Sequence, residues 1–403
     1  MDRIHTKVAG IVSEYNPFHN GHQYHIAETR KMLGENTAVV CVMSGNFVQR
    51  GECACYSKFA RAHAAVLGGA DLVLELPLPW AISSAERFAR GAVAILAAAG
   101  IVTHLSFGSE EGSLERLEAL AKALEAPELD ELIRAELASG ISYAAAREQA
   151  LQKTIGADAQ IIKSPNNILA IEYIKAIRSL KADITPITVM RKGAGHDSAQ
   201  ESEMPSASRL RTIMSQGQAI SSFVPKSSLE ILENEAAQGR GPVTMERLEL
   251  PVLSRLRMLS QMAFNEIPDA GEGSGNRLYA AVREGATLEE ILDKAKTKRY
   301  ARSRLRRMCL CAALGVSAQV VEGLPPYLRV LAANETGRAL LREMSDTAAL
   351  PIVTKPAGAK KLSSEAQSVF YMECAASDLF VLGFQNATER RMAADFRTSP
   401  IMV

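Results

Sequence analysis

The sequence predicts an α/β protein with a parallel-sheet domain in residues 1–225 and a mostly helical domain in residues 226–403. In the first half, short apolar runs that end at turn-forming residues alternate with single helical segments, which is the pattern of βαβ units. The second half is rich in Ala, Leu and Glu, which favour helix. A chain of 403 residues also exceeds one ordinary domain of about 100–200 residues.

The expected strands are five short apolar runs, at residues 8–12, 38–43, 72–76, 103–107 and 184–190. Continuous apolar runs of this length are typical of parallel strands that are covered on both faces. The expected helices between them are at residues 22–33, 57–67, 84–99 and 168–180. Ligands of such sheets bind beyond the carboxyl ends of the strands, so the loops that follow these runs are candidate site segments.

The remaining segments are expected to be helical. Residues 113–154 carry Glu and Asp on one side of an Ala and Leu stripe, which is typical of a solvated acidic helix face. Residues 205–211 open a further helix, and from Met214 onward the pattern is almost wholly helical, without a visible repeat. The domain boundary falls within residues 215–245, and we draw it after residue 225.

Composition narrows the class of protein. Charged residues make up 23% of the chain and the net charge is +1, so any surface for nucleic acid has to be a local patch. The six cysteines do not form a disulfide framework, and both Cys-x-Cys pairs lack zinc-site spacing. Because signal-peptide and transmembrane patterns are absent, we expect a cytoplasmic protein with no membrane segment. We also expect no metal site, and no protein partner is evident.

The segment His19-Asn20-Gly21-His22 lies where the first expected strand meets a helix N-terminus. Unpaired N–H groups and partial positive charge at such an end favour phosphate. Two imidazoles spaced by a small residue can face one phosphate and stabilise the charge that develops in nucleotidyl transfer. Gly21 would let a nucleotide lie close to the backbone. The pattern indicates a nucleotide-using enzyme; surface or capping histidines are the alternative.

Polar residues at other element ends are candidates to complete this site. Ser206, Ser208 and Arg211 open a helix, where hydroxyls and a guanidinium would hold the β and γ phosphates. An N-cap followed by an ordinary helical arginine is the alternative. Asn166 would read a ribose or base, or cap its own helix. Two further candidates flank a glycine-rich turn after the fifth expected strand: Arg191 and His196. Neither a Walker A sequence nor G-x-G-x-x-G occurs.

The densest basic run covers residues 294–307, with eight Lys and Arg among fourteen residues and Tyr300 between them. A cluster of this kind is suited to an RNA backbone. A solvated helix face is the alternative explanation. The residues predicted to contact RNA are Arg299, Arg302, Arg304, Arg306 and Arg307.

Five blocks of the chain form a distinctive set: GIVSEYNPFHNGH (10–22), MSGNFVQRG (43–51), GADLVLELP (69–77), SPNNILAIEY (164–173) and SASRLR (206–211). This set resembles the bacterial tRNA(Met) cytidine acetate ligase family of the HxGH nucleotidyltransferase superfamily. The likeness covers at least residues 8–211 and implies a Rossmann-like nucleotidyltransferase domain followed by helices. The chain departs from the family pattern at Ala170, where Gly is expected, at Ser208, near which Thr is expected, and at Arg209, where a small residue is expected.

The resemblance implies an ATP-dependent ligase with two steps. Acetate attacks the α-phosphate of ATP, giving acetyl-adenylate and pyrophosphate. The N4 amine of the wobble cytidine in elongator tRNA(Met) then takes the acetyl group, giving N4-acetylcytidine and AMP. Mg²⁺ is expected to arrive with ATP.

The same resemblance implies catalytic roles for His19, His22, Ser208 and Arg211. The residues implied to bind ATP are Val12, Ser13, Glu14, Tyr15, Asn16, Pro17, Phe18, His19, Asn20, Gly21, His22, Gln23, Tyr24, His25, Gly108, Asn166 and Arg191. Two other functions stay open at this point. One is a nucleotidyltransferase that acts on a small phosphorylated metabolite, and the other is a non-catalytic RNA-binding protein with a relict nucleotide fold.

Overall fold

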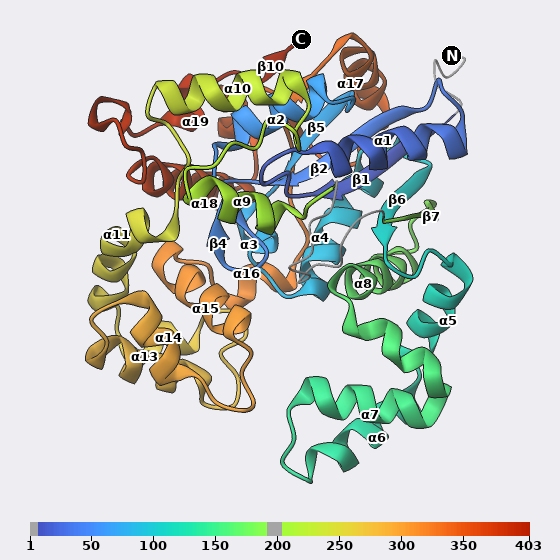
Figure 1. The fold of residues 1–403 in the computed structure, drawn as a ribbon, viewed down its shortest axis with the longest axis vertical. Coiled ribbons are helices and arrows are strands. Elements are labelled where there is room, and N and C mark those ends of the chain that lie inside the picture. The colour runs from blue at the N-terminus through green and yellow to red at the C-terminus, as the bar shows by residue number, and fades with distance from the viewer. Residues whose placement is uncertain (1–6, 192–203) are drawn as a thin grey trace.

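One large sheet forms the centre of the fold in the computed structural model, which describes residues 7–191 and 204–403 (Figure 1). Its strands, in their order across the sheet, are β10 (Ile401–Met402), β8 (Leu328–Ala333), β5 (Leu72–Leu76), β2 (Ala38–Ser44), β1 (Val8–Ser13), β6 (His104–Ser109) and β7 (Thr185–Met190). A short strand, β9 (Ile352–Val353), pairs with β8. A separate antiparallel hairpin consists of β3 (Phe47–Val48) and β4 (Glu52–Cys53).

The five strands predicted from the sequence are confirmed, within two residues at each end, as β1, β2, β5, β6 and β7. They are parallel neighbours in the order 5-2-1-6-7, and Ile11 of β1 pairs with Cys41 on one side and Ser106 on the other. The order reverses between β1 and β6. In doubly wound sheets a crevice opens at such a reversal, beyond the carboxyl ends of the strands.

Helices cover both faces of these strands. Val39 and Cys41 of β2 pack with Ile26 and Ala65 on one face, whereas Val40 and its neighbours on the other face pack with the helices around residues 85–98 and 165–179. This alternation follows from the two-residue period of a strand. The helices up to residue 215 are α1 (Asn20–Leu33), α2 (Lys58–Leu67), α3 (Leu78–Ala81), α4 (Ala85–Ala98), α5 (Leu114–Leu124), α6 (Pro127–Leu137), α7 (Tyr143–Ile155), η1 (Gly156–Lys163), α8 (Pro165–Ser179) and α9 (Ala207–Ser215).

A second helical group lies beside the sheet, opposite α6 and α7 in Figure 1. Its core is apolar and includes Leu248, Leu292, Leu305 and Phe380, which pack with Phe47 of the β3–β4 hairpin. The helices after residue 225 are α10 (Lys226–Ala237), α11 (Met245–Met258), α12 (Gln261–Asn265), α13 (Ser274–Glu284), α14 (Leu288–Ala295), α15 (Arg302–Leu314), α16 (Ala318–Glu322), α17 (Glu335–Thr347), η2 (Pro356–Lys361), α18 (Ser364–Val381), η3 (Ala387–Glu389) and α19 (Ala394–Arg397). None of the helices in the described ranges is long and apolar enough to cross a bilayer.

The second half is mostly helical, but the expectation of an almost wholly helical chain after Met214 is wrong in one respect. Strands β8, β9 and β10 extend the central sheet, and β8 runs antiparallel to β5. The six residues of β8 contain Arg329, which weakens an apolar strand signal, yet this side chain is buried. Its guanidinium pairs with Glu75 at 3.3 Å and Asp395 at 2.7 Å. The boundary after residue 225 stays a prediction.

Candidate nucleotide-binding site

The loop that follows β1 is anchored from several sides. Tyr15 and Phe18 are buried, and the Tyr15 hydroxyl lies 3.2 Å from the Cys41 sulfur of β2. Asn16 is 1% exposed, and its Oδ1 accepts a hydrogen bond from the Cys55 backbone N–H at 2.8 Å. The aromatic rings of this loop therefore act as packing residues, and they fix the backbone that leads into α1.

His19 and His22 form the start of α1, two residues earlier than the sequence predicts for this helix. His19 is the N-cap: its Nδ1 accepts from the Gly21 N–H at 3.0 Å. In return the His19 N–H donates to His22 Nδ1 at 3.2 Å, and the ring centroids are 3.8 Å apart. Because each Nδ1 accepts a hydrogen bond, each neutral ring carries its proton on Nε2. The pair thus presents two Nε2–H donors at a helix N-terminus.

Three imidazoles of this segment are held in the neutral form. Burial, helped by the positive charge of Arg191, lowers the pKa of His19 from 6.5 to about 3 and that of His25 to about 4. Burial also lowers the pKa of His22 well below its usual value, with further contributions from His19 and Arg191. His25 Nε2 lies 2.9 Å from the Ser106 hydroxyl and so ties α1 to β6. Neutral imidazoles at pH 7 act as hydrogen-bond donors without adding net charge.

There is a steric reason for glycine at position 21 that the sequence did not reveal. A Cβ at this position would lie 2.8 Å from Cε1 of His19, closer than side chains approach one another. The glycine therefore makes room for the capping imidazole. Its predicted role in the approach of a nucleotide stays a prediction.

Gly108, Asn166 and Arg191 come from three different elements and meet at the carboxyl end of β6. A Cβ on Gly108 would lie 3.2 Å from Cγ of Arg191, so the glycine accommodates the arginine stem. Glu110 connects the other two: its Oε1 accepts from Asn166 Nδ2 at 2.5 Å and lies 3.8 Å from Arg191 Nε. The sequence did not single out Glu110. His196, also proposed from the sequence, lies outside the described residues.

Asn166 and its neighbour have different tasks. Helix α8 begins at Pro165, three residues before the predicted start, with Ser164 as its N-cap. Asn167 is 3% exposed, and its amide joins three backbone groups: Oδ1 accepts from the N–H groups of Glu110 and Glu111, and Nδ2 donates to a carbonyl in η1. Asn167 therefore holds the loop after β6. The amide of the adjacent Asn166 bonds to the Glu110 side chain instead.

The segment around α9 reaches the loop after β1 through one arginine. Arg211 Nη1 donates to the Asn16 carbonyl at 2.9 Å, and Nη2 lies 3.6 Å from Glu52 Oε2. Ser206 is the N-cap of α9, with its hydroxyl accepting from the Arg209 N–H at 3.2 Å. This was the alternative explanation for Ser206. Ser208 is exposed and lines a cavity described below.

Arg61 is a positioning residue that the sequence analysis missed. It lies on α2 with 0% exposure and donates to the carbonyls of Glu14, Ser44, Gly45 and Tyr56. Burial lowers the pKa of its guanidinium to about 10. It thereby ties the loops after β1 and β2 to one another. An arginine within an alanine-rich helix that also contains Lys58 and His63 was the available signal.

Most arginines of the predicted RNA-contact run already have acidic or carbonyl partners. Arg302 pairs with Glu289 and Asp293, and Arg307 pairs with Asp269 at 3.2 Å. Arg304 donates to the Asp269 carbonyl and Arg306 to Glu52 Oε1, whereas Arg299 is exposed. These pairs reduce the net positive charge of the surface. RNA contact by this run stays a prediction.

Comparison with known proteins decides the family. Residues 6–395 match the family model described as HIGH Nucleotidyl Transferase. A tRNA(Met) cytidine acetate ligase of Acetivibrio thermocellus is 38% identical over 98% of this chain and 100% of its own length. This chain belongs to the tRNA(Met) cytidine acetate ligase family. The tRNA(Met) cytidine acetate ligase of Thermoanaerobacter pseudethanolicus is 39% identical over 94% of this chain and 96% of that protein. The resemblance proposed from the sequence is confirmed, and with it the class of enzyme, a ligase.

Solved structures confirm the nucleotidyltransferase fold. Apo Thermotoga maritima TmcAL matches with a TM-score of 0.93 and 33% identity, covering 98% of this chain and 99% of that one. A second crystal structure of the same protein, bound with alpha-thio ATP, gives a TM-score of 0.91 and 34% identity at the same coverage. Among residues 7–191 and 204–403, no three or more His, Cys, Asp or Glu side chains are arranged to hold a metal ion.

Proposed function

We propose that this ligase activates acetate with ATP and transfers the acetyl group to N4 of the wobble cytidine of elongator tRNA(Met). The product would be N4-acetylcytidine. The proposal rests mainly on the paired Nε2–H donors of His19 and His22 at the N-terminus of α1. Family membership and the ATP analogue bound by the Thermotoga relative support ATP as the substrate.

In the first step, a carboxylate oxygen of acetate attacks the α-phosphorus of ATP and pyrophosphate departs. Negative charge builds on the α-phosphate and on the leaving group in the transition state. His19 and His22 donate to these oxygens, and the N-terminal dipole of α1 acts in the same direction. Arg191 adds a positive charge near the three histidines. Arg211, which is bonded to the Asn16 carbonyl, would hold the β and γ phosphates.

In the second step, the amine of cytidine attacks the carbonyl carbon of acetyl-adenylate and AMP departs. The mixed anhydride is itself the activated acyl donor, so no nucleophilic side chain is required. Ser208 is the remaining predicted phosphate ligand; its exposed hydroxyl is suited to a bound nucleotide. Mg²⁺ would be held mainly by the ATP phosphates, since it keeps several waters and needs few protein ligands.

The test is turnover of ATP with labelled acetate, with and without elongator tRNA(Met), followed by nucleoside analysis of the RNA. We expect label in N4-acetylcytidine at the wobble position and release of both pyrophosphate and AMP. Initiator tRNA(Met) serves as the RNA control. If ATP binds but acetate never reaches RNA, the acceptor is wrong. Transfer of a nucleotide to a small phosphorylated metabolite would then be the function to examine.

A further inference from the structure

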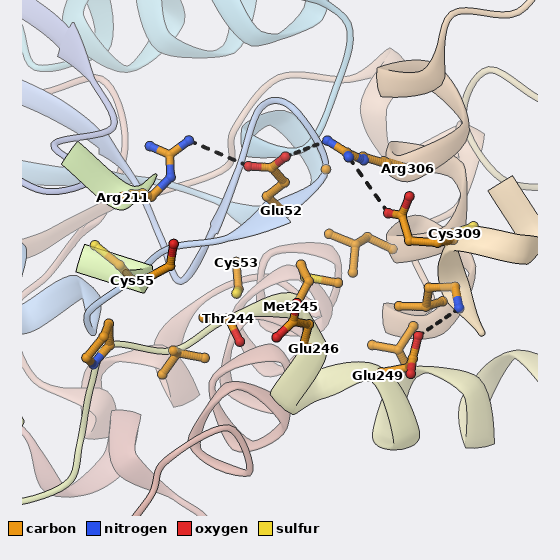
Figure 2. Close-up of a pocket in the computed structure, with 18 of the residues that line it drawn as sticks. Glu52, Cys53, Cys55, Arg211, Thr244, Met245, Glu246, Glu249, Arg306 and Cys309 are labelled. Carbon is orange, nitrogen blue, oxygen red and sulfur yellow. Dashed lines mark hydrogen bonds and ion pairs between the residues drawn. The ribbon is translucent and has the colours of Figure 1, made fainter. Parts of the chain in front are cut away.

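A cavity of about 540 Å³ lies between the β3–β4 hairpin, α9 and the second helical group (Figure 2). Its volume is within the range of about 300–1,000 Å³ that is usual for small-molecule sites. The walls are largely apolar and include Cys53, Met245, Val252 and Leu310. Among the residues that line it, only Ser208 and Arg211 have a part in the function proposed above.

The cavity shares a wall with the loop after β1. Cys55 lines the cavity, and its backbone N–H donates to Asn16 Oδ1 at 2.8 Å. Arg211 lines it too and donates to the Asn16 carbonyl at 2.9 Å. Cys55 and Arg211 therefore stand between a molecule in the cavity and the segment that would hold ATP. An acceptor bound in the cavity would lie next to that segment.

A row of three charged residues forms one side of the cavity. Figure 2 shows Arg211, Glu52 and Arg306 in a row joined by dashed lines. Glu52 Oε1 accepts from Arg306 Nη1 at 2.5 Å, and Oε2 lies 3.6 Å from Arg211 Nη2. The Glu52 side chain is still 27% exposed. A carboxylate acceptor thus stands directly beside guanidinium donors, and Thr244, Glu246 and Glu249 lie across the cavity from them (Figure 2).

This arrangement is complementary to one pyrimidine. Cytosine presents an N4 amine donor next to the N3 and O2 acceptors, and carboxylates in proteins accept from cytosine N4. Uracil presents a carbonyl oxygen where cytosine has the amine, so a carboxylate at that point disfavours it. The apolar side chains among the lining residues would pack against the faces of the base.

We infer that the cavity holds the acceptor cytidine, with Glu52 facing its N4 amine and Arg306 facing N3 and O2. The inference rests on the proposed function, for which it supplies the second substrate subsite. The N4 nitrogen attacks the acetyl carbonyl carbon, and the C–O bond to the adenylate phosphate breaks. AMP leaves with the bonding electron pair. The proton from N4 passes to the Glu52 carboxylate and from there to water.

Two substitutions test the subsite, and the first has a matched control. Met245→Trp fills the cavity from the start of α11, and Leu250→Trp adds the same ring to the same helix at a position that is 76% exposed. Glu52→Gln keeps the shape of the side chain and removes the carboxylate. This second variant keeps the test valid if the larger residue disturbs folding.

Three measurements separate the steps. Acetate-dependent exchange of pyrophosphate into ATP, without RNA, reports adenylate formation. Transfer from synthetic acetyl-adenylate to elongator tRNA(Met) reports the second step alone. Binding of CMP, UMP and AMP, monitored by ligand-detected NMR, reports whether the cavity is occupied, without any turnover.

We expect Met245→Trp and Glu52→Gln to lower transfer by about 100-fold or more, the scale of a lost proton acceptor. Exchange should stay within about threefold of the unmodified protein, and Leu250→Trp should match it in both assays. CMP should bind more tightly than UMP, and Met245→Trp should abolish that binding.

Retained transfer in both variants would overturn the inference, and so would CMP binding that Met245→Trp leaves intact or an unmodified protein that does not bind CMP. Loss of exchange together with transfer would assign the cavity to ATP instead. An unmodified protein that binds CMP but shows neither exchange nor transfer would refute the proposed function while the subsite stands.

Discussion

The neutral state of His19 leads to a prediction in which a substitution stabilises the protein at low pH. In His19→Asn, the asparagine Oδ1 replaces Nδ1 as the acceptor for the Gly21 N–H, since asparagine is a good N-cap. The cap is kept and the titrating group is removed. At pH 7 the free energy of unfolding should therefore differ from that of the unmodified protein by less than about 0.5 kcal/mol.

The magnitude at pH 5 follows from proton linkage. The folded-state pKa of His19 is about 3, and the ordinary value of 6.5 applies to the unfolded chain. A group whose pKa is lower in the folded than in the unfolded state makes its full contribution to stability above pH 6.5. That contribution is lost as the pH falls from 6.5 toward 3. Between pH 7 and pH 5 the unfolded chain takes up a proton that the folded chain does not. This costs the unmodified protein about 2 kcal/mol that the variant does not lose.

Urea unfolding at pH 7 and pH 5 measures this difference. Trp80 is the only tryptophan and is 2% exposed, so its fluorescence reports loss of the fold around the sheet. At pH 5 the His19→Asn variant should be the more stable protein by about 2 kcal/mol. His104→Asn is the control: burial lowers the pKa of that imidazole too, but the side chain is only half-buried, so a smaller effect is expected.

Equal losses of stability in His19→Asn and the unmodified protein between pH 7 and pH 5 would refute the reasoning. His19 would then be protonated in the folded state, and the assignment of its single proton to Nε2 would be wrong. The paired-donor explanation of phosphate binding would have to be replaced by one based on charge.

Three further predictions concern the site, the packing beneath it and the basic run. His22→Ala should lower acetate-dependent pyrophosphate exchange by about 100–1000-fold, as removal of a transition-state donor does, without weakening tRNA binding in a filter assay; exchange within threefold of normal would remove His22 from the site. Gly68→Ala should cost about 1–3 kcal/mol in thermal unfolding, because its Cβ would lie 2.3 Å from a phenylalanine ring of the loop after β1; Gly358→Ala, with nothing within 4 Å, is the control. Arg299→Ala should reduce the salt dependence of tRNA binding by about one unit of slope, more than Arg302→Ala, because Arg302 is already paired with acidic residues; equal slopes would count against this contact.

The strands and the position of the two histidines at a helix start were predictable because their signals are local. The apolar runs, the turn-forming residues after them and the two histidines lie within short stretches of sequence, and each stretch carries the pattern of one element. Arg61 and Glu110 were not predictable in this way. Arg61 acts on carbonyls from two loops, and Glu110 meets Arg191 only after β6 and β7 pair.

The sequence by itself determined the parallel βαβ units, the two histidines at the start of a helix and the family, since these depend on hydrophobic period, backbone chemistry and distinctive blocks of residues. Only the tertiary structure decided that β8 joins the sheet, that Gly21 accommodates a histidine ring and that Glu52 meets Arg306 across 254 positions of sequence. The physical reason is that pairing, steric contact and ion pairing depend on distance in space. A chain that brings remote segments together creates such contacts without leaving a local pattern.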